Sequence, residues 1–177
     1  AATLVKGNTD FALKLYHQLS ANEGNLFFSP HSISSALGMT YAGARGQTEK
    51  EMKAALSFEL EQAKLHAEFK KLNAELASNA RDAGQKLNIA NALCLTNGDV
   101  SKDFEALLKG SYDAEIFPGG LDRINGWVKK KTEGKIAKIL DNLSANSVCV
   151  ILNAIYFKGA WVSEFDKEHT RELPFKV

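Results

Sequence analysis

Histidine, serine and cysteine are the side chains in this 177-residue sequence that could carry out nucleophilic, acid–base or metal chemistry. The histidines are His17, His31, His66 and His169. They form no H-E-x-x-H or other metal-ligand spacing. Ser29 and His31 are close, but residues two apart on a helix do not face each other. Because a G-x-S-x-G elbow and a Walker-type loop are also missing, the sequence predicts no enzyme, no metal site and no cofactor.

The two cysteines, Cys94 and Cys149, lie in different apolar segments. Two cysteines are too few for a disulfide scaffold, and this pair is too far apart for a metal-ligand motif. Free cysteine packs like a small hydrophobic residue, so buried free thiols are the favoured interpretation. A single disulfide between neighbouring strands is the alternative.

Lysines form two groups that could bind a polyanion. The groups are Lys129, Lys130 and Lys131, and Lys64, Lys70 and Lys71. The second group shares its helix with Glu61, Glu68 and Glu75, which dilute its electrostatic field. A solvated helix face is therefore the favoured interpretation. The chain carries 22 basic and 21 acidic residues, a balance that argues against a nucleic-acid-binding protein.

Helical spacing of apolar residues predicts the elements that must position these side chains. Four helices are expected at 9–20, 32–44, 60–78 and 121–133. A short helix is also expected after a capping box formed by Thr48 and Glu51, and another after an N-cap at Ser101. Ser29 and Pro30 suit the N-cap and first position of the second helix. This helix has no charged face, so we expect it to be buried.

Strands are predicted at 25–28, 86–95, 114–117 and 147–157. The second alternates Leu87, Ile89, Asn91, Leu93 and Leu95 at period two. The last is a nearly continuous apolar run, typical of a strand buried on both faces. The order of elements favours an α+β fold. Two long apolar strands imply a large sheet, yet the sequence offers few other strands to flank them. Either a partner completes the sheet or the chain is incomplete.

The sequence has no run of about 20 apolar residues, so no membrane span is predicted. Its first residues do not have the pattern of a signal peptide, which leaves the location open because a mature secreted protein has lost its signal. Asn142, Leu143 and Ser144 fit the N-glycosylation pattern, which matters only for a secreted protein.

Several segments together resemble the serpin family from about Asn8 to the last residue. They are NLFFSPHSISSALGMTYAGARGQTEKEM, INGWVKKKTEGKI, LNAIYFKGAW and the terminal PFKV. The resemblance implies the serpin fold, with N-terminal helices packed on a large central β-sheet that is incomplete in this chain. It also implies that residues 1–177 are the N-terminal portion of a single serpin domain. The reactive-centre loop and the C-terminal strands would then be absent, and the remainder of the serpin could be a second chain.

The resemblance also assigns roles to individual residues. Ser29, Ser32 and Asn153 match the shutter, where the central strands part to admit the reactive loop. On physical grounds alone, a structural hydrogen bond is the favoured role for Asn153, because a buried amide left unpaired costs about 1–3 kcal/mol. Trp161 matches the aromatic residue of the breach, where the loop enters the sheet. A core position is an equally weighted alternative for this tryptophan.

The function implied by the resemblance is inhibition of a serine protease, or alternatively a cysteine protease, by loop insertion into the sheet. This chain would not inhibit alone. The rival is a non-inhibitory serpin acting as a carrier, chaperone or storage protein. Some serpins bind heparin through a helix corresponding to 60–78, so the resemblance adds a heparin-like polyanion as a partner, against which the glutamates of this helix argue. Secretion is favoured over the cytoplasm by family frequency, and neither nucleic acid nor membrane is expected as a partner.

Overall fold

The computed structural model describes residues 2–174, so Ala1 and residues 175–177, which include most of the PFKV segment, lie outside the described residues. Within this part, the helices are α1 (Ala2–Leu19), α2 (Pro30–Gly43), α3 (Gly46–Ala55), α4 (Gln62–Asp82), α5 (Lys102–Tyr112) and α6 (Leu121–Lys131), with a short 3-10 turn, η1 (Lys167–His169). The strands are β1 (Lys86–Leu95), β2 (Glu115–Pro118) and β3 (Cys149–Lys158). This α+β arrangement agrees with the predicted fold class.

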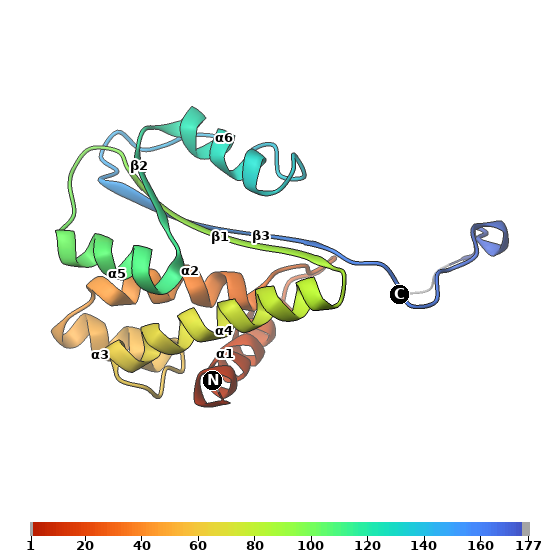
Figure 1. Ribbon diagram of the computed structural model, residues 1–177, viewed down its shortest axis with the longest axis horizontal. Coiled ribbons are helices and arrows are strands. Elements are labelled where there is room, and N and C mark those ends of the chain that lie inside the picture. The colour runs from red at the N-terminus through yellow and green to blue at the C-terminus, as the bar shows by residue number, and fades with distance from the viewer. Residues whose placement is uncertain (1, 175–177) are drawn as a thin grey trace.

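The sheet separates α6 from the other helices (Figure 1). Its strand order is β2-β1-β3, with β1 parallel to β2 and antiparallel to β3. Because successive side chains of a strand point to opposite faces, each strand serves two packing layers. Leu93 and its partner Ile151 face α2, α4 and α5, whereas Ala92 and its partner Leu152 face α6.

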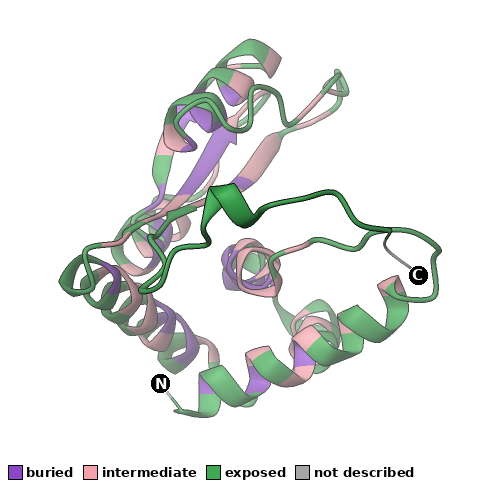
Figure 2. Cartoon of the chain, turned by 90° about the vertical axis from the view of Figure 1, so that its right-hand side faces the viewer, coloured by how far each residue is buried: buried purple, intermediate pink, exposed green. Residues whose placement is uncertain are grey.

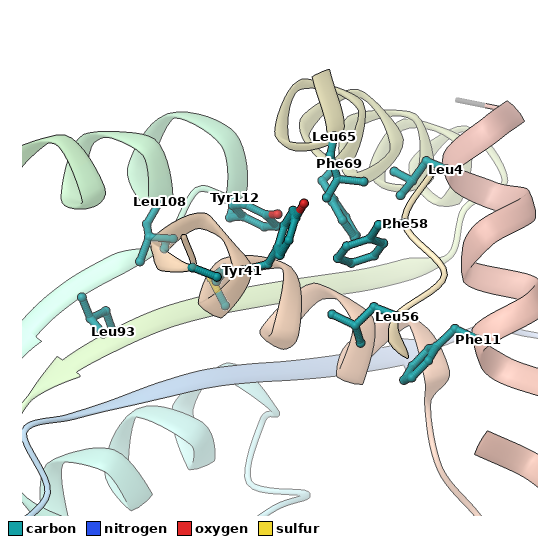
Figure 3. Packing of buried hydrophobic residues seen from close by; sticks show 13 residues of the cluster. Leu4, Phe11, Tyr41, Leu56, Phe58, Leu65, Phe69, Leu93, Leu108 and Tyr112 are labelled. Atoms are coloured by element: carbon teal, nitrogen blue, oxygen red, sulfur yellow. The ribbon is translucent and has the colours of Figure 1, made fainter. Parts of the chain in front are cut away.

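The larger core lies on the side of the sheet away from α6 and combines aromatic rings with leucine side chains (Figure 3). Tyr41 of α2 lies edge-on to Phe58, with ring centroids 5.4 Å apart. Phe69 of α4 and Tyr112 of α5 are also 5.4 Å apart. Such pairs add about 0.5–1.5 kcal/mol to the gain from area burial. The core therefore fixes three helices against one another beneath the sheet.

Helix α2 is the buried helix that the sequence predicts. Ser29 accepts a hydrogen bond from the Ser32 amide at 3.3 Å and Pro30 occupies the first turn, so both cap predictions are confirmed. Gly38 lets α2 approach its neighbours closely, because a Cβ there would lie 2.8 Å from the Tyr112 hydroxyl oxygen. The helix contacts α1 and α4 as well as β3.

The smaller core holds α6 on the opposite face of the sheet. Ile124, Trp127 and Val128 are buried there against β1 and β3. The side chain of Asn125 then fixes the following loop, since its Oδ1 accepts from the Ile139 and Leu140 amides at 2.9 and 3.1 Å. Helix α6 thus covers the sheet as a separate layer (Figure 1).

Two local predictions are wrong. Residues 25–28 form no strand, because no neighbouring strand pairs with them in the described chain, and Phe27 is fully exposed. The Thr48–Glu51 capping box does not form either. Helix α3 already begins at Gly46, with Arg45 as an N-cap that makes no side-chain hydrogen bond, so Thr48 lies inside the helix.

Strand β3 also differs from its prediction as a strand buried on both faces. Leu152 and Ala154 are its buried residues, and the other side chains are half-buried or exposed. The reason is its place in the sheet: within residues 2–174, β1 is its single neighbour and the opposite edge is free. The chain after the strand, residues 159–174, is exposed throughout (Figure 2).

Candidate functional site

A chain of hydrogen-bonded side chains lies where β1 and β3 cross the N-terminal end of α2. Asn91 and Asn153 are direct partners in the antiparallel register, so their side chains emerge on the same face of the sheet. Nδ2 of Asn153 donates to Oδ1 of Asn91 at 2.7 Å. Nδ2 of Asn91 in turn donates to the backbone carbonyl of Tyr112 at 2.8 Å. The chain therefore links β3, β1 and the end of α5.

Helix α2 supplies the other end of this polar chain. The Ser32 hydroxyl donates to Oδ1 of Asn153, which leaves the amide of Asn153 bonded on both sides. Ser29 accepts a hydrogen bond from the Ser32 amide and forms no hydrogen bond with either strand among the described residues, so it supports the site through the helix cap. Ser32 thus reaches the sheet through the side chain of Asn153 and not through the strand backbone.

Asn91 is the site residue that the sequence prediction did not single out. It is buried, with 2% of its surface exposed, and both of its amide atoms are hydrogen-bonded. The available signal was its position in the period-two strand, where a lone amide interrupts a face of leucine and isoleucine. Its pairing with Asn153 depends on the register of strands 62 residues apart, which local patterns do not determine.

His66 lies deeper in the same core, next to Tyr112. Its Nδ1 is 2.8 Å from the Tyr112 hydroxyl, and the two rings are edge-on with centroids 5.7 Å apart. Burial lowers the pKa of His66 to about 4, and the positive charge of Arg45 acts in the same direction. Its Nε2 has no hydrogen-bond partner in residues 2–174. The imidazole is therefore neutral at physiological pH and plays a structural part.

The Ser32 hydroxyl donates to an amide oxygen, which is not a general base, so nothing in this polar chain activates it as a nucleophile. Amides and hydroxyls of this kind do not titrate near neutral pH, and each bond in the chain can be exchanged for another of similar energy. They lie directly beneath β3, whose outer edge is unpaired within the described part of the chain. Such contacts suit a place where strands separate and pair again.

The other predicted site residues lie elsewhere. Trp161 is 73% exposed and touches Phe165 edge-on at a centroid distance of 6.1 Å, so it lies outside both cores of residues 2–174. Asn142 is exposed in a segment without regular structure. Neither residue contributes to the polar chain below β3.

Both cysteines are free thiols, as the favoured interpretation has it. Cys94 is the partner of Val150 in the register, and Cys149 is the partner of Leu95. Their side chains consequently point to opposite faces of the sheet: Cys94 lies in the core beneath α6, whereas Cys149 packs against the larger core. This geometry excludes the disulfide alternative without a change of register.

The lysines of the two predicted groups are mostly solvated. Lys64, Lys70 and Lys71 are exposed on α4. Of the second group, Lys129 and Lys130 are exposed and Lys131 pairs with Glu115. No helix within residues 2–174 has the length and apolar character to cross a bilayer. No cluster of three or more potential metal ligands occurs in that range.

Comparison with known proteins gives one family. The family described as Serpin (serine protease inhibitor) matches residues 6–177. Iripin-2 of Ixodes ricinus is 38% identical over 98% of this chain and 47% of its own length. Leukocyte elastase inhibitor of Xenopus tropicalis is 37% identical over 96% of this chain and 48% of its own. Serpin B6 of Bos taurus is 40% identical over 98% of this chain and 50% of its own length.

The fold comparison agrees with the sequence comparison. The structure of cleaved kallistatin complexed with heparin superposes with a TM-score of 0.86 at 30% identity, covering 93% of this chain and 52% of that one. The chain therefore spans about half the length of the relatives that it matches. Its helices and three strands are accordingly a part of the complete fold. With the family match extending over nearly the whole sequence, this chain belongs to the serpin family.

Proposed function

We propose that residues 1–177 are the N-terminal portion of a single serpin domain, and that the whole protein inhibits a serine protease. In this mechanism the protease cleaves the reactive loop, which lies in the remainder of the serpin, and becomes covalently attached to it. The cleaved loop then enters the sheet as an added strand. Strand addition is favourable because it satisfies backbone groups that an unpaired edge leaves without partners.

The observation that carries the proposal is the chain of exchangeable hydrogen bonds that runs from Ser32 through Asn153 to Asn91 beneath β3. An inserting strand needs an edge to pair with and polar contacts that can be exchanged as the sheet opens. In the proposed roles, Ser32 and Asn153 form the shutter and Ser29 supports it through the α2 cap. Trp161, exposed beyond the end of β3, is proposed to meet the incoming loop at the breach.

The relatives support inhibition as the activity. Several of them are named leukocyte elastase inhibitor, and the matching family is described as serine protease inhibitors. We propose an elastase-like or trypsin-like serine protease as the partner. The second proposed partner is the C-terminal remainder of the same serpin, as a continuous or separate chain. Kallistatin was solved with heparin, so a heparin-like polyanion is a further partner to test.

The test mixes the full-length protein with active serine proteases and looks for complexes that survive SDS. Inhibition by loop insertion gives a covalent complex with an active protease and none with a protease whose nucleophilic serine is replaced by alanine. Cleavage of the serpin without a complex would instead support the non-inhibitory carrier, chaperone or storage alternative.

A variant within this chain connects the activity to the site. Asn153→Asp removes the donor to Asn91 and places a charge below β3. We expect it to raise the number of serpin molecules consumed per protease inhibited. Asn146→Asp changes the same residue type at an exposed position and should leave this number unchanged. If Asn153→Asp and Asn146→Asp change this number equally, Asn153 has no specific role in the mechanism.

The location of the protein remains a prediction in which secretion is favoured and the cytoplasm is the alternative. The names of the relatives favour neither. Exposure of Asn142 makes it accessible to glycosylation if the chain passes through the secretory pathway.

A further inference from the structure

A surface cavity lies at the outer edge of β2, away from the chain of hydrogen bonds below β3. It has a volume of about 650 Å³ and is formed by β2, α6 and the end of α5. Volumes of this size are typical of sites for small molecules. Apolar groups from Ile116, Phe117 and Trp127 form one part of its lining. The rings of Phe117 and Trp127 are 6.2 Å apart between centroids.

Three cationic side chains form the other part of the lining: Lys109, Arg123 and Lys130. The Arg123 guanidinium carbon lies 5.5 Å from the centroid of the Phe117 ring. This contact holds its planar group beside the apolar lining, where it can offer two parallel N–H donors to a carboxylate. Within residues 2–174, neither Arg123 nor Lys130 forms an ion pair, whereas Lys109 lies 3.4 Å from Glu105.

The single acidic residue of the lining, Glu115, is already engaged. Its Oε2 accepts from Nε1 of Trp127 at 3.0 Å, and its other oxygen pairs with Lys131, which is not part of the lining. The cavity therefore places positive charge outside any ion pair of the described residues beside the exposed parts of Phe117 and Trp127, which are 8% and 9% exposed. An uncharged apolar ligand would gain no charge contact from Arg123 and Lys130, and an inorganic anion would gain no contact with the apolar lining.

We propose that this cavity binds a small amphipathic carboxylate, with an aryl or alkyl body against Phe117 and Trp127 and the carboxylate between Arg123 and Lys130. The complementarity of both shape and charge carries the inference. The inference does not depend on protease inhibition, because the cavity lies at the β2 edge of the sheet and the free edge of β3 is the opposite edge.

Gly126 offers a way to fill the cavity without disturbing the fold. It lines the cavity from α6, and a Cβ built on it meets no atom within 4 Å. Gly126→Leu therefore places a side chain in open space at the ligand position. Gly110 is a matched control, because it also lies in a helix with open space around its Cβ but outside the cavity.

The experiment titrates the full-length protein with 2-naphthoate by isothermal titration calorimetry, with the neutral 2-naphthylmethanol as the matched uncharged compound. We expect saturable binding with a Kd between about 10 µM and 1 mM. The alcohol should bind about tenfold more weakly or not at all, since it lacks the charge. Decanoate, titrated in parallel, identifies the preferred body: tighter binding of naphthoate indicates an aryl acid, and tighter binding of decanoate an alkyl acid.

The variants locate the site. Gly126→Leu should weaken naphthoate binding by about tenfold or more, and Gly110→Leu should not change it. Arg123→Gln and Lys130→Gln should each weaken binding by about three- to tenfold. Lys129→Gln, an exposed neighbour outside the lining, should have no effect. Thermal melts of each variant establish that it is folded.

Three results would overturn the proposal. One is the absence of saturable binding of both acids to the full-length protein. Another is equal binding of the acid and the alcohol. The third is equal loss of affinity in Gly126→Leu and Gly110→Leu.

Discussion

Asn91 and Asn153 face each other across β1 and β3, with Nδ2 of Asn153 donating to Oδ1 of Asn91 at 2.7 Å. This pair joins two strands on the face where all neighbouring positions are apolar, and it is bonded further to Ser32 and to the Tyr112 carbonyl. The cost of a buried amide is therefore offset only while both strands stay in register.

Asn91→Leu should lower the free energy of unfolding by about 1–3 kcal/mol, because it leaves the Tyr112 carbonyl and Nδ2 of Asn153 without partners. The double variant Asn91→Leu with Asn153→Leu should cost less than the sum of the single changes, since an apolar pair then meets across the strands. Urea unfolding measures both. Asn88→Leu, on the same strand but facing the other side of the sheet, is the control. Strict additivity would contradict the coupling.

The strands themselves are largely determined by local sequence. The alternation from Lys86 to Leu95 predicts β1 with both of its ends, and the apolar run at 147–157 predicts β3 within two residues. The buried helix α2 follows from its uncharged faces and from the cap at Ser29. In these segments, local propensity and tertiary packing favour the same structure.

Local patterns fail where the outcome depends on a distant partner. Residues 25–28 have strand-like residues but no strand to pair with in the described chain, so Phe27 is left in solvent. The apolar run of β3 resembles a fully buried strand, yet its second neighbour is not within residues 2–174. The pairing of Asn91 with Asn153 and the opposite orientation of the two cysteines likewise depend on the register between β1 and β3. Spacing along one segment carries no information on that register.

Acidification should destabilise the fold through His66. Burial lowers its folded pKa to about 4, whereas an unfolded histidine titrates near 6.5, so the unfolded chain binds a proton that the folded chain excludes. The contribution of His66 to the free energy of unfolding is therefore fully present above about pH 6.5. It is lost as the pH drops towards 4, by about 3 kcal/mol in all. Burial also lowers the pKa of His31, which adds in the same direction.

Urea midpoints between pH 7.5 and 4.5 measure this effect. His66→Gln keeps a polar side chain that does not titrate, so it should reduce the dependence on pH whatever it does to stability at neutral pH. His169→Gln alters an exposed histidine and should retain the full dependence. Identical pH profiles for the protein and for His66→Gln would show that another group is responsible.

The close approach at Gly38 predicts a position where even one methyl group is harmful. A Cβ there would lie 2.8 Å from the Tyr112 hydroxyl oxygen and 3.2 Å from an atom of the Phe69 ring. Alanine favours a helix over glycine by about 1 kcal/mol, but overpacking a well-filled core costs about 1–3 kcal/mol. Gly38→Ala should therefore lower the melting temperature. Gly110→Ala, with open space around its Cβ, should raise it or leave it unchanged; stabilisation by both changes would contradict the packing described here.

The exposed triplet at Asn142 connects the structure with the location of the protein. Asn142 is solvent-exposed and lies in a segment without helix or strand, so its side chain is accessible within the described residues. If the protein is secreted by a eukaryotic cell, it should carry a glycan that peptide N-glycosidase removes, and Asn142→Gln should abolish the corresponding shift in mass. Asn146→Gln, four residues away and outside any such triplet, should retain the shift. Protein recovered from its native source with an unmodified Asn142 and no presence in the extracellular fraction would contradict secretion and favour the cytoplasm, because transfer of the glycan to an accessible triplet accompanies entry into the secretory pathway.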